Sequence, residues 1–171
     1  VLFGDYNPCG KLPVTFPRHS GQLPVNYDHV PSKTRWIEKG YIDMPATPLY
    51  AFGHGLSYTK FEYSNLKISS TEINQGENVI ISFQVKNTGE RKGKEVVQLY
   101  INDELGSVTT PVKKLRGFEK LELLPEETKS LFFTLTPEDL TLLDKNMKWV
   151  VEPGKFYVMI GSSSVDIRLQ G

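Results

Sequence analysis

From about residue 61 onwards the sequence alternates between apolar and polar positions with a period of two. In the clearest run, 79–86, every second position is apolar: Val79, Ile81, Phe83 and Val85. A period of two sends successive side chains to opposite faces of a β-strand, and the Asn-Thr-Gly that follows at 87–89 is a turn signal. The run therefore predicts a strand with one buried face.

Eight short segments carry strand signals of this kind, and turn residues separate one from the next. They are Tyr63–Ile68, Asn78–Lys86, Glu95–Asn102, Lys114–Leu123, Thr128–Thr136, Met147–Val151, Lys155–Ile160 and Val165–Leu169. Strands spaced about 8–12 residues apart, without long helical patterns between them, are typical of antiparallel sandwiches and argue against a parallel sheet. We therefore predict an all-β fold, an antiparallel sandwich of the immunoglobulin-like type.

The positions expected to face inward define a predicted core. It comprises Val79, Ile81, Phe83, Val85, Val97, Leu99, Ile101, Leu121, Leu131, Phe133, Leu135, Trp149, Phe156, Val158 and Ile160. Burying a large apolar side chain stabilises a fold by about 1.5–3 kcal/mol, so truncating Phe83 or Trp149 to alanine is expected to unfold a marginal domain.

One helical turn is predicted at 136–140, where the sequence is Thr-Pro-Glu-Asp-Leu. Thr136 is a suitable N-cap, Pro137 fits the first helical position, and Asp139 supplies an acid three residues after the cap. We expect this turn to cross between the two sheets, with a leucine at 140, 142 or 143 closing one end of the core.

Residues 1–60 differ in character from the rest, because seven of the 11 prolines lie in the first fifty positions. Proline lacks an amide donor and pushes the residue before it towards extended conformations, which excludes a long helix or a central strand. We expect a loop-rich, extended segment here, with one short strand at Lys11–Phe16.

The charge balance excludes several classes of partner. The 171 residues include 39% apolar and 23% charged residues, and 20 basic side chains cancel 20 acidic ones. This composition excludes collagen, coiled coil and disorder. A neutral chain also lacks the one-signed field that nucleic-acid binders and polybasic membrane-surface proteins use, so we expect no nucleic-acid and no membrane partner.

The start of the chain and its single cysteine add two expectations. The sequence opens without methionine and without a signal-peptide pattern, so we expect an interior or C-terminal piece of a longer protein, any targeting sequence having preceded it. Cys9 alone allows neither an intrachain disulfide nor a zinc site of paired cysteines, and it leaves the cell compartment open.

Residues able to carry catalysis do not form a recognisable set. Most acids beyond residue 60 lie among lysines in turns or on polar faces, which favours a solvated surface. In the N-terminal segment a Ser/His/Asp set can be assembled only on paper, from Asp5, His19, Ser20, Asp28, His29 and Asp43. No nucleophile elbow or other motif fixes it. The histidines lack metal-ligand spacing, 102–106 lacks the alternating oxygens of a calcium loop, and 53–55 is too short to cradle a phosphate. We expect no catalytic residue, metal or cofactor.

Five aromatic residues gather where the loop-rich segment meets the predicted sandwich: Tyr50, Phe52, Tyr58, Phe61 and Tyr63. One interpretation is a sugar-binding platform, since aromatic rings stack on sugar faces. The other is a hydrophobic joint to a neighbouring domain, with the tyrosine hydroxyls bonded at its rim. We favour the joint, because a single stretch on a linker is a poor place for a flat exposed platform.

Long motifs in this chain resemble the family 3 glycoside hydrolases, the β-glucosidase and β-xylosidase group. Residues 4–17 (GDYNPCGKLPVTFP) are similar to the end of that family's α/β domain, with Cys9 where the family usually has serine. Residues 48–59 (PLYAFGHGLSYT) resemble its junction into a C-terminal fibronectin type III-like domain. The motifs at 85–89, 95–100, 114–118 and 153–156 continue the match along essentially the whole chain.

The resemblance implies a division of the chain and the absence of its catalytic groups. It implies a remnant of the α/β domain and linker at 1–48, an aromatic junction at 49–60 and a fibronectin type III-like domain at 61–171. The family's nucleophilic aspartate comes from a barrel domain, and its acid/base glutamate from an earlier part of the α/β domain. Neither has a matching position here, so the resemblance implies that this fragment is inactive alone. For the parent enzyme, the resemblance implies hydrolysis of β-linked glucosides or oligosaccharides with retention.

We therefore expect a non-catalytic C-terminal module that buttresses the upstream catalytic domains of its parent chain. The candidate joint residues are Tyr50, Phe52, His54, Leu56 and Tyr58. The family's secreted and periplasmic members make export of the parent an expectation, while sugar specificity and oligomeric state stay open. The alternative is a carbohydrate-binding or adhesive module, which needs exposed aromatics on a flat sheet face; on these strand assignments most aromatics point inward.

Overall fold

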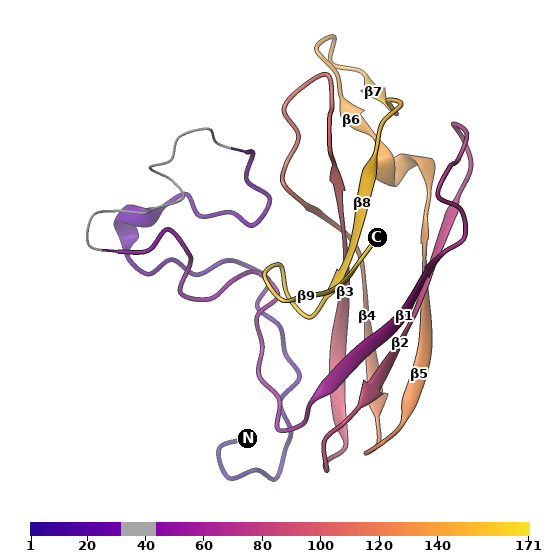
Figure 1. Cartoon of the computed structure of the whole chain (residues 1–171). Helices are drawn as coiled ribbons and strands as arrows, with labels where there is room; N and C mark the ends of the chain where they lie inside the picture. Colours follow the sequence, from indigo (N-terminus) through magenta and orange to yellow (C-terminus); the bar gives the residue numbers. More distant parts are fainter. Residues whose placement is uncertain (32–43) are drawn as a thin grey trace.

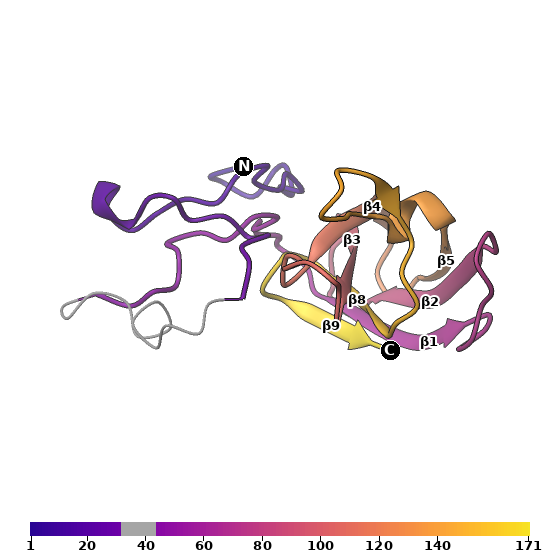
Figure 2. The ribbon, with the colours of Figure 1, turned by 90° about the horizontal axis from the view of Figure 1, so that it is seen from above.

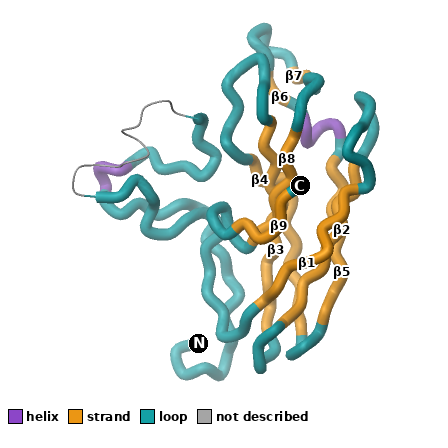
Figure 3. The backbone as a smooth tube through the Cα atoms, in the orientation of Figure 1, coloured by secondary structure: helices purple, strands orange, loops and turns teal. Residues whose placement is uncertain are grey.

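The structure is a computed structural model that describes residues 1–31 and 44–171. Its elements are η1 (Ser20–Gln22), β1 (Phe61–Ile68), β2 (Val79–Asn87), β3 (Gly93–Asp103), β4 (Lys114–Leu123), β5 (Thr128–Leu135), η2 (Pro137–Leu140), β6 (Leu142–Leu143), β7 (Trp149–Val150), β8 (Phe156–Gly161) and β9 (Ile167–Gln170). Two antiparallel sheets, with strand orders β1-β2-β5 and β4-β3-β8-β9, pack face to face, while β6 and β7 form a small hairpin at one end (Figures 1 and 3).

The predicted all-β, fibronectin type III-like sandwich is confirmed. Each of the eight predicted strands has a counterpart within a few residues, and β6 is an additional strand that the pattern did not predict. The helical turn is also confirmed: it is the 3₁₀ helix η2, where the Asp139 carboxylate accepts hydrogen bonds from the N–H (2.9 Å) and the hydroxyl (3.0 Å) of Thr136. Leu140 is buried in the core, as expected of one of the three leucines.

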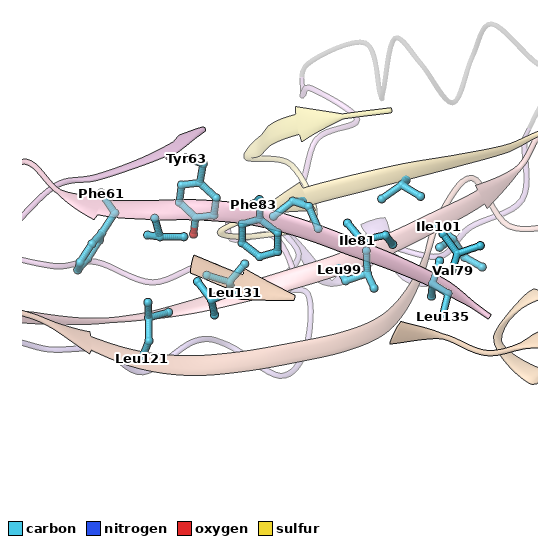
Figure 4. Close-up of a cluster of buried hydrophobic side chains, with 14 of the residues drawn as sticks. Phe61, Tyr63, Val79, Ile81, Phe83, Leu99, Ile101, Leu121, Leu131 and Leu135 are labelled. Atoms are coloured by element: carbon cyan, nitrogen blue, oxygen red, sulfur yellow. The ribbon is translucent and has the colours of Figure 1, made fainter. Parts of the chain in front are cut away.

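The core lies between the two sheets and follows the predicted alternation. In β2, the inward residues Ile81 and Phe83 lie opposite Phe133 and Leu131 of β5, and their side chains fill the space between the sheets (Figure 4). Twelve of the 15 predicted core residues belong to the buried cluster, and two more pack against it half-buried. Trp149 is wrong: it is 67% exposed, because β7 belongs to the small hairpin and faces no opposing sheet.

The N-terminal segment lies beside the sandwich and not within it, as two perpendicular views show (Figures 1 and 2). The strand predicted at Lys11–Phe16 is wrong, since Phe16 forms only an isolated bridge with Tyr50, in which the Phe16 N–H donates to the Tyr50 carbonyl at 2.8 Å. Pro13 and Pro17 supply no amide donors, so an extended ladder cannot continue on either side of this bridge. Among the described residues, no helix is long and apolar enough to cross a membrane.

Candidate interdomain joint

The joint between the N-terminal segment and the sandwich is built on the outer face of β3. Val97, Leu99 and Ile101 point into the core, so the alternate residues Gln98 and Tyr100 point outwards, yet both are buried. A sheet strand that is buried on both faces must satisfy its outward polar groups by contacts with another segment. Residues 1–31 and 44–60 supply that cover.

Gln98 is the polar centre of the joint. Its amide nitrogen donates to the Ser162 carbonyl at 2.8 Å and to the Gly53 carbonyl at 3.5 Å, and its amide oxygen accepts from the Tyr100 hydroxyl at 2.5 Å. Gly53 has a φ of +80°, and a Cβ there would lie 2.2 Å from the Gln98 amide oxygen. Only glycine therefore allows the 44–60 segment to approach β3 this closely.

Aromatic rings complete the cover over Tyr100. Tyr27 stacks on Phe52 with ring centroids 4.2 Å apart and meets Tyr100 edge-on at 5.9 Å. The Tyr27 hydroxyl also accepts a hydrogen bond from the N–H of Leu115 on β4. Burial, with a smaller contribution from Tyr27, raises the pKa of Tyr100 well above its usual value, so this hydroxyl remains a donor across the physiological range.

The segment is also attached by the Ser162–Ser164 turn and by an ion pair. The Ser164 N–H donates to the Phe52 carbonyl at 3.0 Å, and Lys113 Nζ donates to the Ser164 carbonyl at 2.7 Å; burial lowers the pKa of Lys113. The Lys11 ammonium lies 2.9 Å from the Glu95 carboxylate, with side-chain exposures of 14% and 8%. A pair this sheltered is costly to break from one side only.

The five predicted joint residues occupy different environments. Phe52 is half-buried in the stack described above. The His54 ring lies 5.1 Å from that of Tyr50, which in turn meets Phe16 edge-on, and the Tyr58 hydroxyl donates to the Val1 carbonyl at 2.7 Å. Leu56 is 73% exposed. Phe52 thus joins the segment to the sandwich, and a role of all five at a contact with another domain stays a prediction.

The aromatic residues of the strands differ in whether their side chains are buried or exposed. Phe61 and Tyr63, from the aromatic cluster, lie in the sandwich core, where burial above all raises the pKa of the Tyr63 hydroxyl (Figure 4). In contrast, Phe118 and Phe132 are 69% and 70% exposed. The expectation that most strand aromatics point inward is therefore wrong at these two positions and at Trp149, because each lies on a face or an end that no described segment covers.

The Ser/His/Asp set considered in the sequence analysis does not form a catalytic triad in the described part of the chain. His19 Nδ1 accepts from the N–H of Gly21, and His29 Nδ1 lies 3.1 Å from the carbonyl of Asn26, so each ring is held by its own neighbouring backbone. Asp43 lies outside the described residues. Across 1–31 and 44–171 no three His, Cys, Asp or Glu side chains come together in a way that could hold a metal ion.

Sequence reasoning missed Gln98, Tyr100, Tyr27 and the Lys11–Glu95 pair. One signal could have found the first two: residues 96–102 (VVQLYIN) carry no charge at any outward position. A strand whose two faces are both uncharged is typical of a strand buried on both sides. Tyr27 and Lys11 carry no such signal, because their partners on the sandwich, Tyr100 and Glu95, lie more than 70 positions away in the sequence.

The fold and the joint together define a class of protein: a fibronectin type III-like sandwich with an N-terminal segment fixed to its outer face. Comparison with family models finds two matches. Residues 95–164 match the fibronectin type III-like domain, and residues 1–58 match the glycosyl hydrolase family 3 C-terminal domain. The chain belongs to the family 3 glycoside hydrolases and corresponds to their C-terminal region.

Similar proteins of known name support the same assignment. The chain is 45% identical over 175 residues to the periplasmic β-glucosidase of Salmonella typhimurium and 43% identical over 164 residues to a β-xylosidase of Formosa agariphila, covering 98% and 96% of this chain. The structure of a β-glucosidase from Erythrobacter marinus superposes with a TM-score of 0.92 over the whole chain, at 43% identity. This chain spans only 23%, 23% and 22% of those three proteins, respectively.

Proposed function

We propose that the chain is a non-catalytic module of a β-glucosidase-type glycoside hydrolase, and that it stabilises the upstream catalytic domains by covering part of their apolar surface. The proposed division is 1–48 for the end of the α/β domain and linker, 49–60 for the junction and 61–171 for the sandwich. The proposed substrates of the whole enzyme are β-linked glucosides or oligosaccharides. The names of the similar proteins support the reaction, and the joint supports the role of the module.

One observation carries this proposal. The N-terminal segment is fixed to β3 by buried polar and aromatic contacts, yet it also exposes large apolar side chains, among them Leu2 at 90% and Phe3 at 94%. Exposed apolar side chains gathered on one segment mark a surface that another body covers. A segment that matches the end of a second domain has an obvious partner of that kind in the remainder of that domain.

The test compares three polypeptides from the gene that encodes this chain. They are the full-length product, a shortened product that ends just before Val1 and so lacks this chain, and residues 1–171 alone. Each is assayed on an aryl β-glucoside before and after heating. We expect the full-length product to turn over the substrate and residues 1–171 to show no turnover. The activity of the shortened product should have a shorter half-life at elevated temperature than that of the full-length product. Turnover by 1–171 in several independent preparations, or equal half-lives with and without this chain, would overturn the proposal.

A second candidate function is carbohydrate binding on the outer face of β1-β2-β5. Phe132 is 70% exposed there, and a ladder of polar side chains crosses the same sheet: Asn65 donates to Gln84 at 2.6 Å, and Gln84 to Ser130 at 3.3 Å. An exposed ring beside amide and hydroxyl groups is a surface on which a sugar can stack. Titration with cello-oligosaccharides tests it: saturable binding that Phe132→Ala removes supports this candidate, and no binding excludes it.

A further inference from the structure

The motif at 114–118 (KLRGF) contains an arginine that the joint does not use. Arg116 is half-buried, and its Nε has no solvent-accessible surface and no hydrogen-bond partner in the described part of the chain. The other described arginines each have one: Arg18 donates to the Thr47 carbonyl at 2.9 Å, Arg91 to the Gly4 carbonyl at 3.2 Å, and Arg168 to the Asp166 carboxylate at 2.7 Å.

An unpartnered guanidinium at this place has a physical cost. Arginine stays charged at any physiological pH and presents its N–H donors in a rigid, planar fork. A donor removed from water without an acceptor costs free energy that the fold must supply elsewhere. The buried Nε of Arg116 has no partner among the described residues, so an acceptor supplied from outside them would relieve this cost.

The position of Arg116 connects it to the joint. It lies on β4, the strand at one edge of the four-stranded sheet, at the irregularity where β4 passes Leu99 and Tyr100 of β3. The preceding residue, Leu115, is already bonded to the Tyr27 hydroxyl of the N-terminal segment. Two positions on, Phe118 pairs in register with Gln98 and is 69% exposed. A charged donor and an uncovered aromatic ring therefore continue the joint along β4.

We propose that Arg116 and Phe118 form the docking site on which the preceding catalytic part of the enzyme is seated, with a carboxylate of that part bound to the Arg116 guanidinium and an apolar side chain packed on Phe118. The inference rests on the proposed function and adds the chemistry of the contact. A carboxylate matches the guanidinium fork in a bidentate pair, the strongest acceptor geometry that a protein side chain offers. The occupant is the catalytic part because residues 1–58, which match the end of its last domain, cover the adjacent strand β3.

The docking site is tested by comparing how removal of the guanidinium changes the melting temperature of residues 1–171 and of the full-length enzyme. In residues 1–171 alone, Arg116→Met keeps the apolar stem and removes an unpaired donor, so the melting temperature stays equal to that of the wild type or rises. In the full-length enzyme the same change removes a pair, so the melting temperature falls by several degrees. Lys145→Met, at an exposed lysine of the β6–β7 turn, is the control and changes neither. A fall of similar size in both contexts would assign Arg116 to the internal structure of the chain and overturn the proposal.

A cross-linking experiment identifies the partner directly. Arg116→Lys keeps the charge and provides an amine that carbodiimide joins to a carboxylate within contact distance, and mass spectrometry then locates the linked peptide. We expect a link within one polypeptide, to an Asp or Glu that precedes Val1. A link between two copies, or none while the enzyme remains active and folded, would overturn this site. Either result leaves the proposed function standing, since that function fails only if the wild-type chain does not stabilise the enzyme.

Discussion

Replacing Gly53 with alanine is the most direct perturbation of the joint. The left-handed backbone at φ +80° costs an alanine about 1–2 kcal/mol. The new Cβ would lie 2.2 Å from the Gln98 amide oxygen, so the amide must move and leave a buried group unpaired, which costs about 1–3 kcal/mol more. We therefore expect Gly53→Ala to lower the free energy of unfolding by about 2–5 kcal/mol, a large share of a typical domain's stability.

Two other glycines separate these contributions. Gly76 has a φ of +97° and Gly10 does not have a positive φ, and a Cβ at either would meet nothing within 4 Å. Urea unfolding of residues 1–171, followed by circular dichroism, should therefore rank the alanine variants: Gly10→Ala near the wild type, Gly76→Ala lower by the backbone cost alone, and Gly53→Ala lowest. If Gly53→Ala and Gly76→Ala lose the same stability, then Gln98 does not hold the segment, and the account of the joint fails.

Three further predictions concern the sandwich and its attachment. Phe83→Ala should cost about 3–5 kcal/mol in urea unfolding, whereas Trp149→Ala, at an exposed site, should stay within about 0.5 kcal/mol of the wild type; equal losses would contradict the core assignment. Lys11→Met leaves the Glu95 carboxylate sheltered and unpaired, so we expect a loss of about 3–5 kcal/mol that Lys11→Arg does not show. The Arg168 guanidinium, which donates to the Asp166 carboxylate, is the main cause that lowers the pKa of this carboxyl. The stability that the charged carboxylate gives is therefore present above its unfolded pKa of about 3.9 and is lost as the pH falls through the lower folded value. Asp166→Asn should flatten that decline in unfolding experiments run from neutral to acid pH.

The strands could be predicted from the sequence because burial between two sheets leaves a local record. Residues 79–86 alternate whether or not their partners are known, and β5 opposite them carries the same period. The failures have equally physical causes. Phe16 lies in an alternating stretch, but the neighbouring prolines prevent a ladder, and Trp149 alternates within a hairpin that has no sheet to face.

The joint was only partly visible in the sequence because its contacts join distant positions. Phe52 was found from the aromatic cluster, but the ring that it stacks on, Tyr27, lies 25 positions earlier in a stretch without periodicity. Arg116 is a polar residue on a strand, and a polar residue facing water gives the same pattern as one facing another segment. Only the three-dimensional arrangement distinguishes the two for Arg116, through the missing partner of its Nε.

Strand β3 belongs to two hydrophobic interiors at once, since Leu99 packs between the sheets and Tyr100 packs under Tyr27. A recombinant fragment that starts at Phe61 would therefore place Gln98 and Tyr100 in water and lose the ion pair of Glu95. Engineers who exchange C-terminal modules between enzymes of this family should therefore not cut at the start of β1. The transferable part is the sandwich together with the segment that covers it.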